Sequence, residues 1–595
     1  MQNINDKAIS IVEKFNSGNK DGALKEIEFL INSNDQNVDL LFIKAKMLIN
    51  VNQIDSAISI LYKILLLEPK NKLVIEVIYL NLIKIKKFKN AEEYIDKLLI
   101  LKVIKYEILR DKAYLRYLKK DKKEAEKFIK KALTLNPNEA FGLNILGLLK
   151  MLDNNIIESI KIFEKAISID KNYTDSYNNI GKCYIDLENL NYAYLYFKKA
   201  YRINPKIDLP IINIANILSL KDKNKLAIKF LLKAKIINPE NAIIDENIAM
   251  CKCRLKDFKW VQKYYNSTKN KNYQNYDFVL GYSYLLLNKY KFDEGFKLFD
   301  ARLLASKFSE KNIYHKNIIH KLIKEDEINS DSKILVIKEQ GVGDEILFSS
   351  MYYNLINQCQ NLSIECDERL IKIFKRTYQK DIFFKYGYFS STKKSIKNFD
   401  KVIYAGSLTK YFRKNKSDFI SKLFLKSSLS VDNNISQKLN KFNKTKKIGL
   451  SWKSVVNIYG GLKSLNLRNF EKIFDKDRTI INLQYGDVNK EINDLNNYGC
   501  NIYSFKEINL FNDFDSVISI LKNIDVFVTV SNSTAHFAGA LGVPTILICP
   551  KKSSTYYYWD YENGKTPWYE SVSVIKLENS IDRTIDLVNK MIDKI

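Results

Sequence analysis

The stretch NIDVFVTVSNSTAHFAGALGVPTILICP, residues 523–550, predicts a strand, a tight turn, a short helix and a second strand in immediate succession. Residues 524–530 are apolar and rich in β-branched side chains, as expected for a parallel strand covered on both faces. Residues 531–534, Ser-Asn-Ser-Thr, are types whose short side-chain oxygens cap helices. Gly542 ends the short helix, and residues 545–549 form the next strand. The stretch therefore predicts a parallel α/β sheet.

The turn of this stretch has a chemical consequence. It falls at the carboxyl end of a strand, where open α/β sheets bind ligands. The N–H groups and the positive dipole end of the new helix favour a phosphate or diphosphate there. A well-capped crossover without a ligand fits the same residues. His536, one of only three histidines, falls in the first turn of this helix and favours a functional site, although a lone histidine is more often structural than catalytic.

The length, charge and apolar content of the chain limit the classes of function that we expect for it. A length of 595 residues suggests three or four domains, and the net charge of +28 is spread over many helices and loops. We therefore expect no dedicated nucleic-acid role. A basic RNA-binding protein is kept as an alternative function. No run of eighteen apolar residues occurs, and the first residues lack a signal-peptide core, so we expect a cytoplasmic protein without a transmembrane segment. Peripheral membrane association is left open.

The cysteines and histidines do not indicate a metal site. Seven cysteines include no CxxC pair, and no cluster of His and Cys has metal-ligand spacing. Reduced thiols and the absence of a metal or cofactor are the resulting expectations.

Residues 1–305 carry a repeat of 34 residues. One series of small residues consists of Ala23, Ala57, Ala91, Ala125, Ser159, Ala193, Ala227 and, after Val261, Gly295. A second series lies twelve positions earlier and includes Ala45, Gly147 and Gly181. Because only small side chains let two helix backbones approach, these series mark the crossing of two helices in a hairpin. The period and positions resemble tetratricopeptide repeats, and nine units fit, of which the third is weak.

The concave surface of such a solenoid suggests a partner. We expect the groove to capture a polypeptide or a larger partner, although a passive scaffold or a dimer contact is the alternative. Residues 306–331 are polar without a clear period and are interpreted as a linker, in which His315 and His320 are solvated or packing residues.

From residue 333 the pattern changes to alternating strands and helices. Residues 334–337 are a buried strand, followed by a turn with Gly341 and Gly343. The third glycine of a dinucleotide fingerprint is missing, so NAD is not expected. Asp344 follows at the carboxyl end of the strand, which suits a general base or an acceptor contact. The alternative is that Asp344 is an N-cap and Glu345 a first-turn acid favoured by the helix dipole.

A second set of strands and helices begins near residue 443. The strand at residues 448–450 is followed by Lys453, and the strand at residues 480–483 is followed by Gln484. We therefore expect two Rossmann-like domains, residues 332–442 and 443–595, which face each other across a cleft lined by their strand ends.

The ordered motifs resemble a known family. ILVIKEQGVGDEILFSS, SIECDERLIKIF, KVIYAGSLTKYF, KIGLSWKS, INLQYGD, VTVSNSTAHFAGALGVPTILICP and WDY…TPWY are similar to the glycosyltransferase module of bacterial tetratricopeptide-repeat glycosyltransferases. That module resembles the ADP-heptose:lipopolysaccharide heptosyltransferases, which have a GT-B fold. The resemblance covers roughly residues 331–580. The repeat-plus-GT-B layout also resembles O-GlcNAc transferase, with less similarity at the level of motifs.

The resemblance implies roles for particular residues. Asp344 would be the general base, and His536 is the second catalytic candidate. Gly341, Gly343, Lys453, Gln484, Ser533 and Thr534 would bind the donor. The leaving diphosphate would lie against Ser533 and Thr534, Lys453 would neutralise charge, and Gln484 would lie near the base or ribose. Trp559 and Trp568 are candidates for a sugar platform, with core packing as the alternative.

One departure from the family concerns the loop after Trp452. Such modules usually carry arginines there, whereas this chain has SVVNIYGG with only Lys453 and Lys463 nearby.

The sequence as a whole predicts a glycosyltransferase. It would move a sugar from a nucleoside diphosphate sugar to a protein or surface-glycan acceptor chosen partly by the repeats, with inversion and without a metal. The alternative is a non-catalytic repeat scaffold with a vestigial GT-B module.

Overall fold

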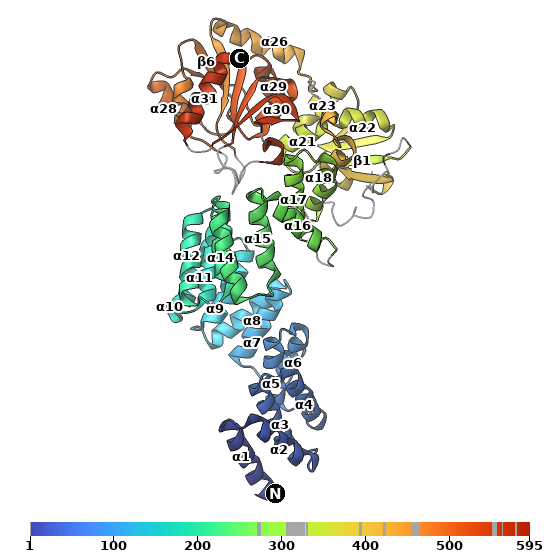
Figure 1. Cartoon of the computed structure of the whole chain (residues 1–595), viewed down its shortest axis with the longest axis vertical. Coiled ribbons are helices and arrows are strands. Elements are labelled where there is room, and N and C mark those ends of the chain that lie inside the picture. The colour runs from blue at the N-terminus through green and yellow to red at the C-terminus, as the bar shows by residue number, and fades with distance from the viewer. Residues whose placement is uncertain are drawn as a thin grey trace. The chain divides into compact units, whose positions relative to one another are not determined.

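The computed structural model describes residues 2–270, 275–304, 328, 331–391, 396–419, 424–454, 464–549, 556–561, 563–577 and 580–595. His315, His320 and Lys463 lie outside these residues, as does most of the expected linker. The chain divides into two compact units, Met1–Asn213 and Ile214–Ile595 (Figure 1).

The first unit consists of antiparallel helix pairs. Its helices are α1 (Gln2–Asn16), α2 (Lys20–Asn32), α3 (Val38–Asn50), α4 (Ile54–Leu67), α5 (Lys72–Lys84), α6 (Phe88–Ile100), α7 (Tyr106–Leu118), α8 (Lys122–Leu135), α9 (Ala140–Leu152), α10 (Ile156–Ile169), α11 (Thr174–Asp186), α12 (Leu190–Ile203) and the beginning of α13 (Asp208–Leu220). This arrangement agrees with the hairpins that the 34-residue period predicts.

Small residues let the two helices of a pair approach each other closely. A β-carbon added at Gly181 of α11 would lie 2.5 Å from Cε1 of Phe197 on α12, and Gly147 of α9 lies against Phe163 of α10 in the same way. Both phenylalanines are fully buried. The predicted small-residue crossings are therefore present, and each glycine makes room for an aromatic ring on the second helix.

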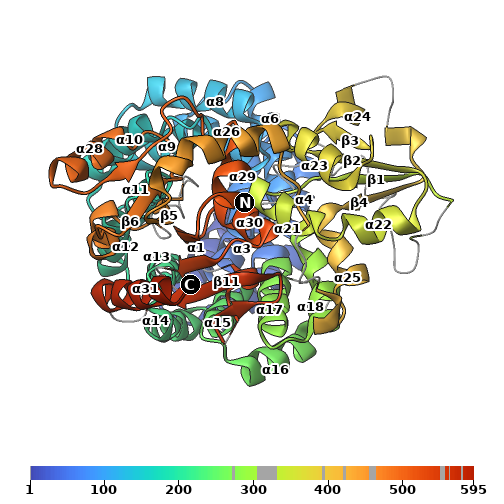
Figure 2. The ribbon, with the colours of Figure 1, turned by 90° about the horizontal axis from the view of Figure 1, so that it is seen from above.

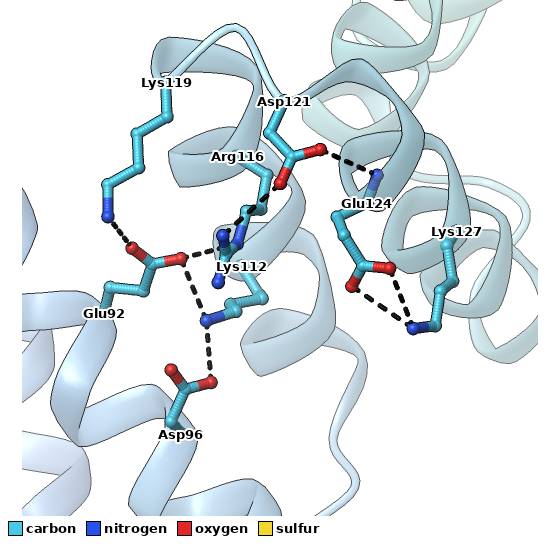
Figure 3. A network of polar contacts seen from close by, with 8 residues as sticks. All are labelled: Glu92, Asp96, Lys112, Arg116, Lys119, Asp121, Glu124 and Lys127. Carbon is cyan, nitrogen blue, oxygen red and sulfur yellow. Dashed lines mark hydrogen bonds and ion pairs between the residues drawn. The ribbon is translucent and has the colours of Figure 1, made fainter.

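A charged network joins the third and fourth helix pairs. Glu92 of α6 lies between Lys112, Arg116 and Lys119 of the next pair (Figure 3). Lys112 Nζ lies 2.9 Å from Glu92 Oε1 and 2.6 Å from Asp96 Oδ1, and the Lys112 side chain is only 2% exposed. Burial raises the pKa of Glu92, but the three cations outweigh it and hold the pKa below its usual value.

This network yields a stability prediction. Glu92→Gln leaves Lys112 buried with fewer partners, so we expect a local loss of about 3 kcal/mol. Hydrogen exchange of amides in α6 and α7 should then become about 100-fold faster. Because the pKa of Glu92 is lowered by folding, its contribution is present at neutral pH and is lost as the pH falls below the ordinary carboxyl range.

Glu124→Gln is the matched control, because Glu124 pairs with Lys127 while both side chains are largely exposed. It should change exchange by less than about threefold, as expected for a surface pair. Equal effects of the two substitutions would contradict the role given to Glu92.

The second unit begins with the last helix pairs. Its helices are the end of α13, α14 (Asn224–Ile237), α15 (Ala242–Arg254), α16 (Phe258–Thr268), α17 (Tyr276–Asn288) and α18 (Phe292–Phe299), followed by the 3₁₀ helix η1 (Asp300–Leu303). Val261, which interrupts the small-residue series, is fully buried in α16.

Two sheets follow. The first has four parallel strands in the order β3-β2-β1-β4. They are β1 (Ile334–Ile337), β2 (Leu362–Cys366), β3 (Phe383–Lys385) and β4 (Lys401–Tyr404). The helices of this region are α21 (Val342–Ser349), α22 (Tyr352–Gln358), α23 (Ile371–Tyr378), α24 (Tyr388–Ser391) and α25 (Thr409–Phe412).

The second sheet has the order β10-β11-β9-β8-β5-β6-β7 and is parallel except between β10 and β11. Its strands are β5 (Lys446–Ser451), β6 (Arg478–Asn482), β7 (Ile502–Tyr503), β8 (Val526–Val530), β9 (Thr545–Cys549), β10 (Lys565–Thr566) and β11 (Tyr569–Lys576). The helices are α26 (Leu429–Leu439), α28 (Asn489–Asn497), α29 (Phe514–Lys522), α30 (Ser533–Leu541) and α31 (Ile581–Lys594).

Both sheets are consistent with Rossmann-like domains. Without β10, the second sheet has the strand order 3-2-1-4-5-6 of that fold, and its order reverses between β5 and β8. The first sheet reverses between β1 and β4. These reversal points are where sheets of this type bind ligands.

Some predicted elements differ from the structure. The segment after residue 466 forms the 3₁₀ helix η8 (Leu467–Ile473), and two helices, α21 and α22, follow the turn with Gly341 and Gly343. The strands β3, β10 and β11 were not predicted from the sequence. β3 has only three residues, and β11 lies in an aromatic-rich tail whose apolar alternation is weak.

The last repeat is built into the first sheet. Arg302 of η1 forms two hydrogen bonds with Glu339, from Nε to Oε2 at 2.7 Å and from Nη2 to Oε1 at 2.6 Å. The Arg302 side chain is 3% exposed and the Glu339 side chain is fully buried. Glu339 also accepts a bond from the Gly406 amide, which follows β4. The ion pair therefore occupies the reversal point between β1 and β4.

Candidate functional site

The turn between β8 and α30 is closed by Asn532. This residue is the N-cap, and its Oδ1 accepts a bond from the Ala535 amide at 3.2 Å. Its Nδ2 donates to Ser451 Oγ at the end of β5, at 2.8 Å. The amide side chain therefore joins the two strands on either side of the reversal point.

Ser533 and Thr534 form the first turn of α30. Thr534 is buried and Ser533 is half-buried. Within the described part of the chain, the amides of Ser533 and Thr534 have no hydrogen-bond acceptor. Such amides, together with the dipole of a nine-residue helix, attract an anion.

Gln484 holds the end of β5 against the end of β6. Its Oε1 accepts bonds from Ser451 Oγ at 3.0 Å, the Trp452 amide at 2.9 Å and the Lys453 amide at 2.7 Å. Its Nε2 donates to the Tyr485 carbonyl at 2.9 Å, and the side chain is 1% exposed. A contact between Gln484 and a base or ribose stays a prediction. In the structure, the hydrogen bonds of its side chain hold the ends of the two strands together.

Lys453 lies beside a cavity of about 360 Å³. Its Nζ pairs with Glu491, which also accepts a bond from Trp452 Nε1 at 3.1 Å. The cavity is lined by Lys453, Leu465, Asn466, Leu467, Arg468, Glu491, Asp494 and Leu495. In this structure the charge of Lys453 is therefore balanced by Glu491.

Asp344 acts as a cap at the start of α21. Its Oδ2 accepts a bond from the Gly341 amide at 3.3 Å, and it is half-buried. Its charge also acts on neighbouring tyrosines: burial and then Asp344 raise the pKa of Tyr558 and of Tyr569. A catalytic role for Asp344 stays a prediction.

The loop of Asp344 lies directly on α30. A β-carbon added at Gly343 would be 2.7 Å from Cδ2 and 3.2 Å from Nε2 of His536. α21 and α30 pack side by side (Figure 2). The structure thus brings together the loop of Gly341, Gly343 and Asp344 and the helix of Ser533, Thr534 and His536.

Glu345 is an acidic residue whose burial the sequence did not indicate. It is 1% exposed, and burial raises its pKa to about 7 although Lys338 lowers it. Lys338 Nζ lies 2.9 Å from Oε1, and the Asp367 amide donates to Oε2 at 2.8 Å. Glu345 therefore fixes the first turn of α21 to the ends of β1 and β2. Its place next to Asp344 was the only signal in the sequence.

Aromatic side chains surround His536. Its ring centroid lies 5.1 Å from that of Tyr558 and 4.9 Å from that of Trp559. Trp559 is 1% exposed and Trp568 is 3% exposed, and Trp568 packs edge-on against Phe419. Burial favours core packing for both tryptophans over an open sugar platform.

Among the described residues, no group of three or more His, Cys, Asp and Glu side chains is arranged to hold a metal ion. The same residues include no helix with the length and apolarity needed to cross a membrane.

Comparison with known proteins supports the assignment of tetratricopeptide repeats. A family model described as a tetratricopeptide repeat matches residues 108–139 and 174–207. The chain is a tetratricopeptide-repeat protein with a C-terminal α/β region that contains two sheets. It is a distant homologue of Protein FlbA from Caulobacter vibrioides, to which it is 27% identical over 257 residues, or 40% of this chain and 42% of FlbA. The match thus spans about two fifths of that relative.

Solved structures of repeat proteins are also similar. A tetratricopeptide repeat protein from Parabacteroides merdae has a TM-score of 0.39 and 16% identity, covering 42% of this chain and 99% of its own. PilF from Pseudomonas aeruginosa has a TM-score of 0.28 and 16% identity, covering 35% of this chain and 89% of its own.

The contact between Gly343 and His536 gives a second prediction. Gly343→Ala forces the ring or the loop to move, and we expect a loss of stability of about 1–3 kcal/mol, as in overpacked cores. Gly341→Ala is the matched control, because its β-carbon would meet only Asp344 Oδ2, at 3.8 Å. Thermal unfolding should show a lower midpoint for Gly343→Ala alone. Similar midpoints for both variants would exclude the close contact.

Proposed function

We propose that the protein is a glycosyltransferase that uses a nucleoside diphosphate sugar. The observation that carries this proposal is the contact between the Asp344 loop and the first turn of α30. It brings the loop that carries Asp344 against the helix whose first amides, those of Ser533 and Thr534, have no acceptor among the described residues. Such a pairing suits a reaction in which an acceptor is deprotonated while a diphosphate leaves.

The proposed step uses groups on both sheets. Asp344 takes the proton of an acceptor hydroxyl, and the hydroxyl oxygen bonds to the anomeric carbon of the sugar. The bond from that carbon to the diphosphate breaks, and its electron pair stays on the leaving group. The amides of Ser533 and Thr534 stabilise the charge on the diphosphate. Attack from the opposite face gives inversion.

Lys453 has a conditional part in this proposal. Its ammonium is paired with Glu491, so a contact with the diphosphate requires that pair to open or to rearrange. The backbone around Lys453 is already fixed by Gln484. We therefore assign charge neutralisation first to the helix amides and second to Lys453.

The repeats take part in choosing the acceptor. We assign residues 1–305 to the repeats, residues 332–442 to the acceptor side and residues 443–595 to the donor side. The acceptor is a protein or a surface-glycan precursor. Because η1 and the first sheet share the Arg302–Glu339 pair, an acceptor held by the last repeats stays close to Asp344.

Transfer and hydrolysis assays test this function. UDP-, GDP-, ADP- and CMP-sugars are first compared by thermal shift, and turnover is measured with those that bind. Asp344→Asn keeps an oxygen for the Gly341 amide but loses the base, so we expect turnover to fall at least about 100-fold. His536→Ala should also lower turnover.

Asp513→Asn is the control, because Asp513 also caps a helix: it is the N-cap of α29 and accepts a bond from the Ser516 amide at 3.1 Å. It should keep turnover within twofold. Donor binding without turnover in the wild type would favour the non-catalytic scaffold. Turnover equal to that of the wild type in the Asp344 and His536 variants would remove both assignments.

A further inference from the structure

Tyr569 is placed to control the orientation of His536. It is the first residue of β11, and its hydroxyl lies 3.1 Å from Nδ1 of His536. It is 3% exposed, as is His536. A hydrogen bond between two buried groups is retained more strongly than one exposed to water, because neither group has water as a substitute.

Tyr569 is itself fixed by α30. A β-carbon added at Gly539 would lie 2.5 Å from Cγ of Tyr569, so the ring lies directly on the helix backbone one turn after His536. Only glycine allows this approach. The ring of Phe424 is nearly parallel to that of Tyr569, with centroids 6.5 Å apart. The hydroxyl therefore has little freedom to move away from Nδ1.

The contact with Tyr569 also determines which way the second ring nitrogen of His536, Nε2, points. With Nδ1 bonded to Tyr569, the Cδ2–Nε2 edge of the ring faces Gly343, the residue before Asp344. A ring flip would exchange these edges and would remove the bond to Tyr569. Tyr558 and Trp559 pack on the ring and restrict it further.

We propose that Tyr569 is a positioning residue that holds the His536 ring in one orientation, with Nε2 directed at the Asp344 loop. The kinetic part of this inference rests on the proposed function. The orientation of the ring does not, because it follows from contacts within the protein.

Nuclear magnetic resonance tests the orientation without any substrate. The full chain is labelled with ¹³C,¹⁵N-histidine, and the spectrum of His536→Gln identifies the His536 signals among the three histidines. The ¹⁵N shift of Nδ1 reports on its hydrogen bond. We expect one set of His536 ring signals in the wild type and a shifted or mixed set in Tyr569→Phe, which removes only the hydroxyl.

Tyr557→Phe is the matched control. Tyr557 lies in the same aromatic cluster, with its ring centroid 5.1 Å from that of Tyr558, but its buried hydroxyl has no hydrogen-bond partner among the described residues. It should leave the His536 signals unchanged. An unchanged His536 signal in Tyr569→Phe, or an equal change in both variants, would overturn the proposal.

Kinetics supply the second measurement. With a donor that turns over, Tyr569→Phe should lower kcat about tenfold and leave KM within twofold, because a misplaced ring affects the reaction more than donor binding. A fall in kcat without a change in the His536 signals would also contradict the proposal. If no donor turns over, the proposed function fails, while the spectra still decide the orientation.

Discussion

The buried ion pair between Arg302 and Glu339 is the constraint on which the second unit depends. Burial lowers the pKa of Arg302, but Glu339 and Asp300 more than compensate, so the guanidinium stays charged. Removing one partner of such a pair costs roughly 3–5 kcal/mol, because the other charge is left buried. Asp300 extends the pair through Lys410 at 2.9 Å and Ser407 at 2.5 Å. The last repeat therefore acts as part of the first sheet.

This constraint also bears on the proposed ligand site. The Arg302–Glu339 pair lies at the reversal point of the first sheet, the place where such sheets usually bind ligands. In the second sheet, Asn532 and Ser451 bridge the reversal point between β5 and β8, directly before α30. The site that we propose lies beside that point, where α21 and α30 begin. Helix N-termini favour a negative charge.

The sequence predicted the repeats and most strands, since each depends on local patterns. Small residues at 34-residue spacing mark the helix crossings, and Gly181 meets Phe197 as expected. The strands around β8 were found because their side chains are apolar on both faces. β11 was missed because its half-buried alternation lies among aromatic residues that signalled binding instead.

The candidate site was predictable in position but less so in detail. Strand ends and helix starts placed Asp344, His536 and Thr534 on turns that the fold brings together. The partners of the polar side chains depend on tertiary contacts between distant segments, so the sequence could not show that Gln484 binds three donors or that Lys453 pairs with Glu491. It also gave no sign that Tyr569 reaches His536, 33 residues earlier.

A crystal structure with the nucleoside diphosphate that gives the largest thermal shift tests the central claim most directly. The account predicts the diphosphate oxygens within hydrogen-bonding distance of the Ser533 and Thr534 amides, on the side of α30 that faces Gly343. A diphosphate held elsewhere, for example in the cavity beside Lys453 and Arg468, would contradict it.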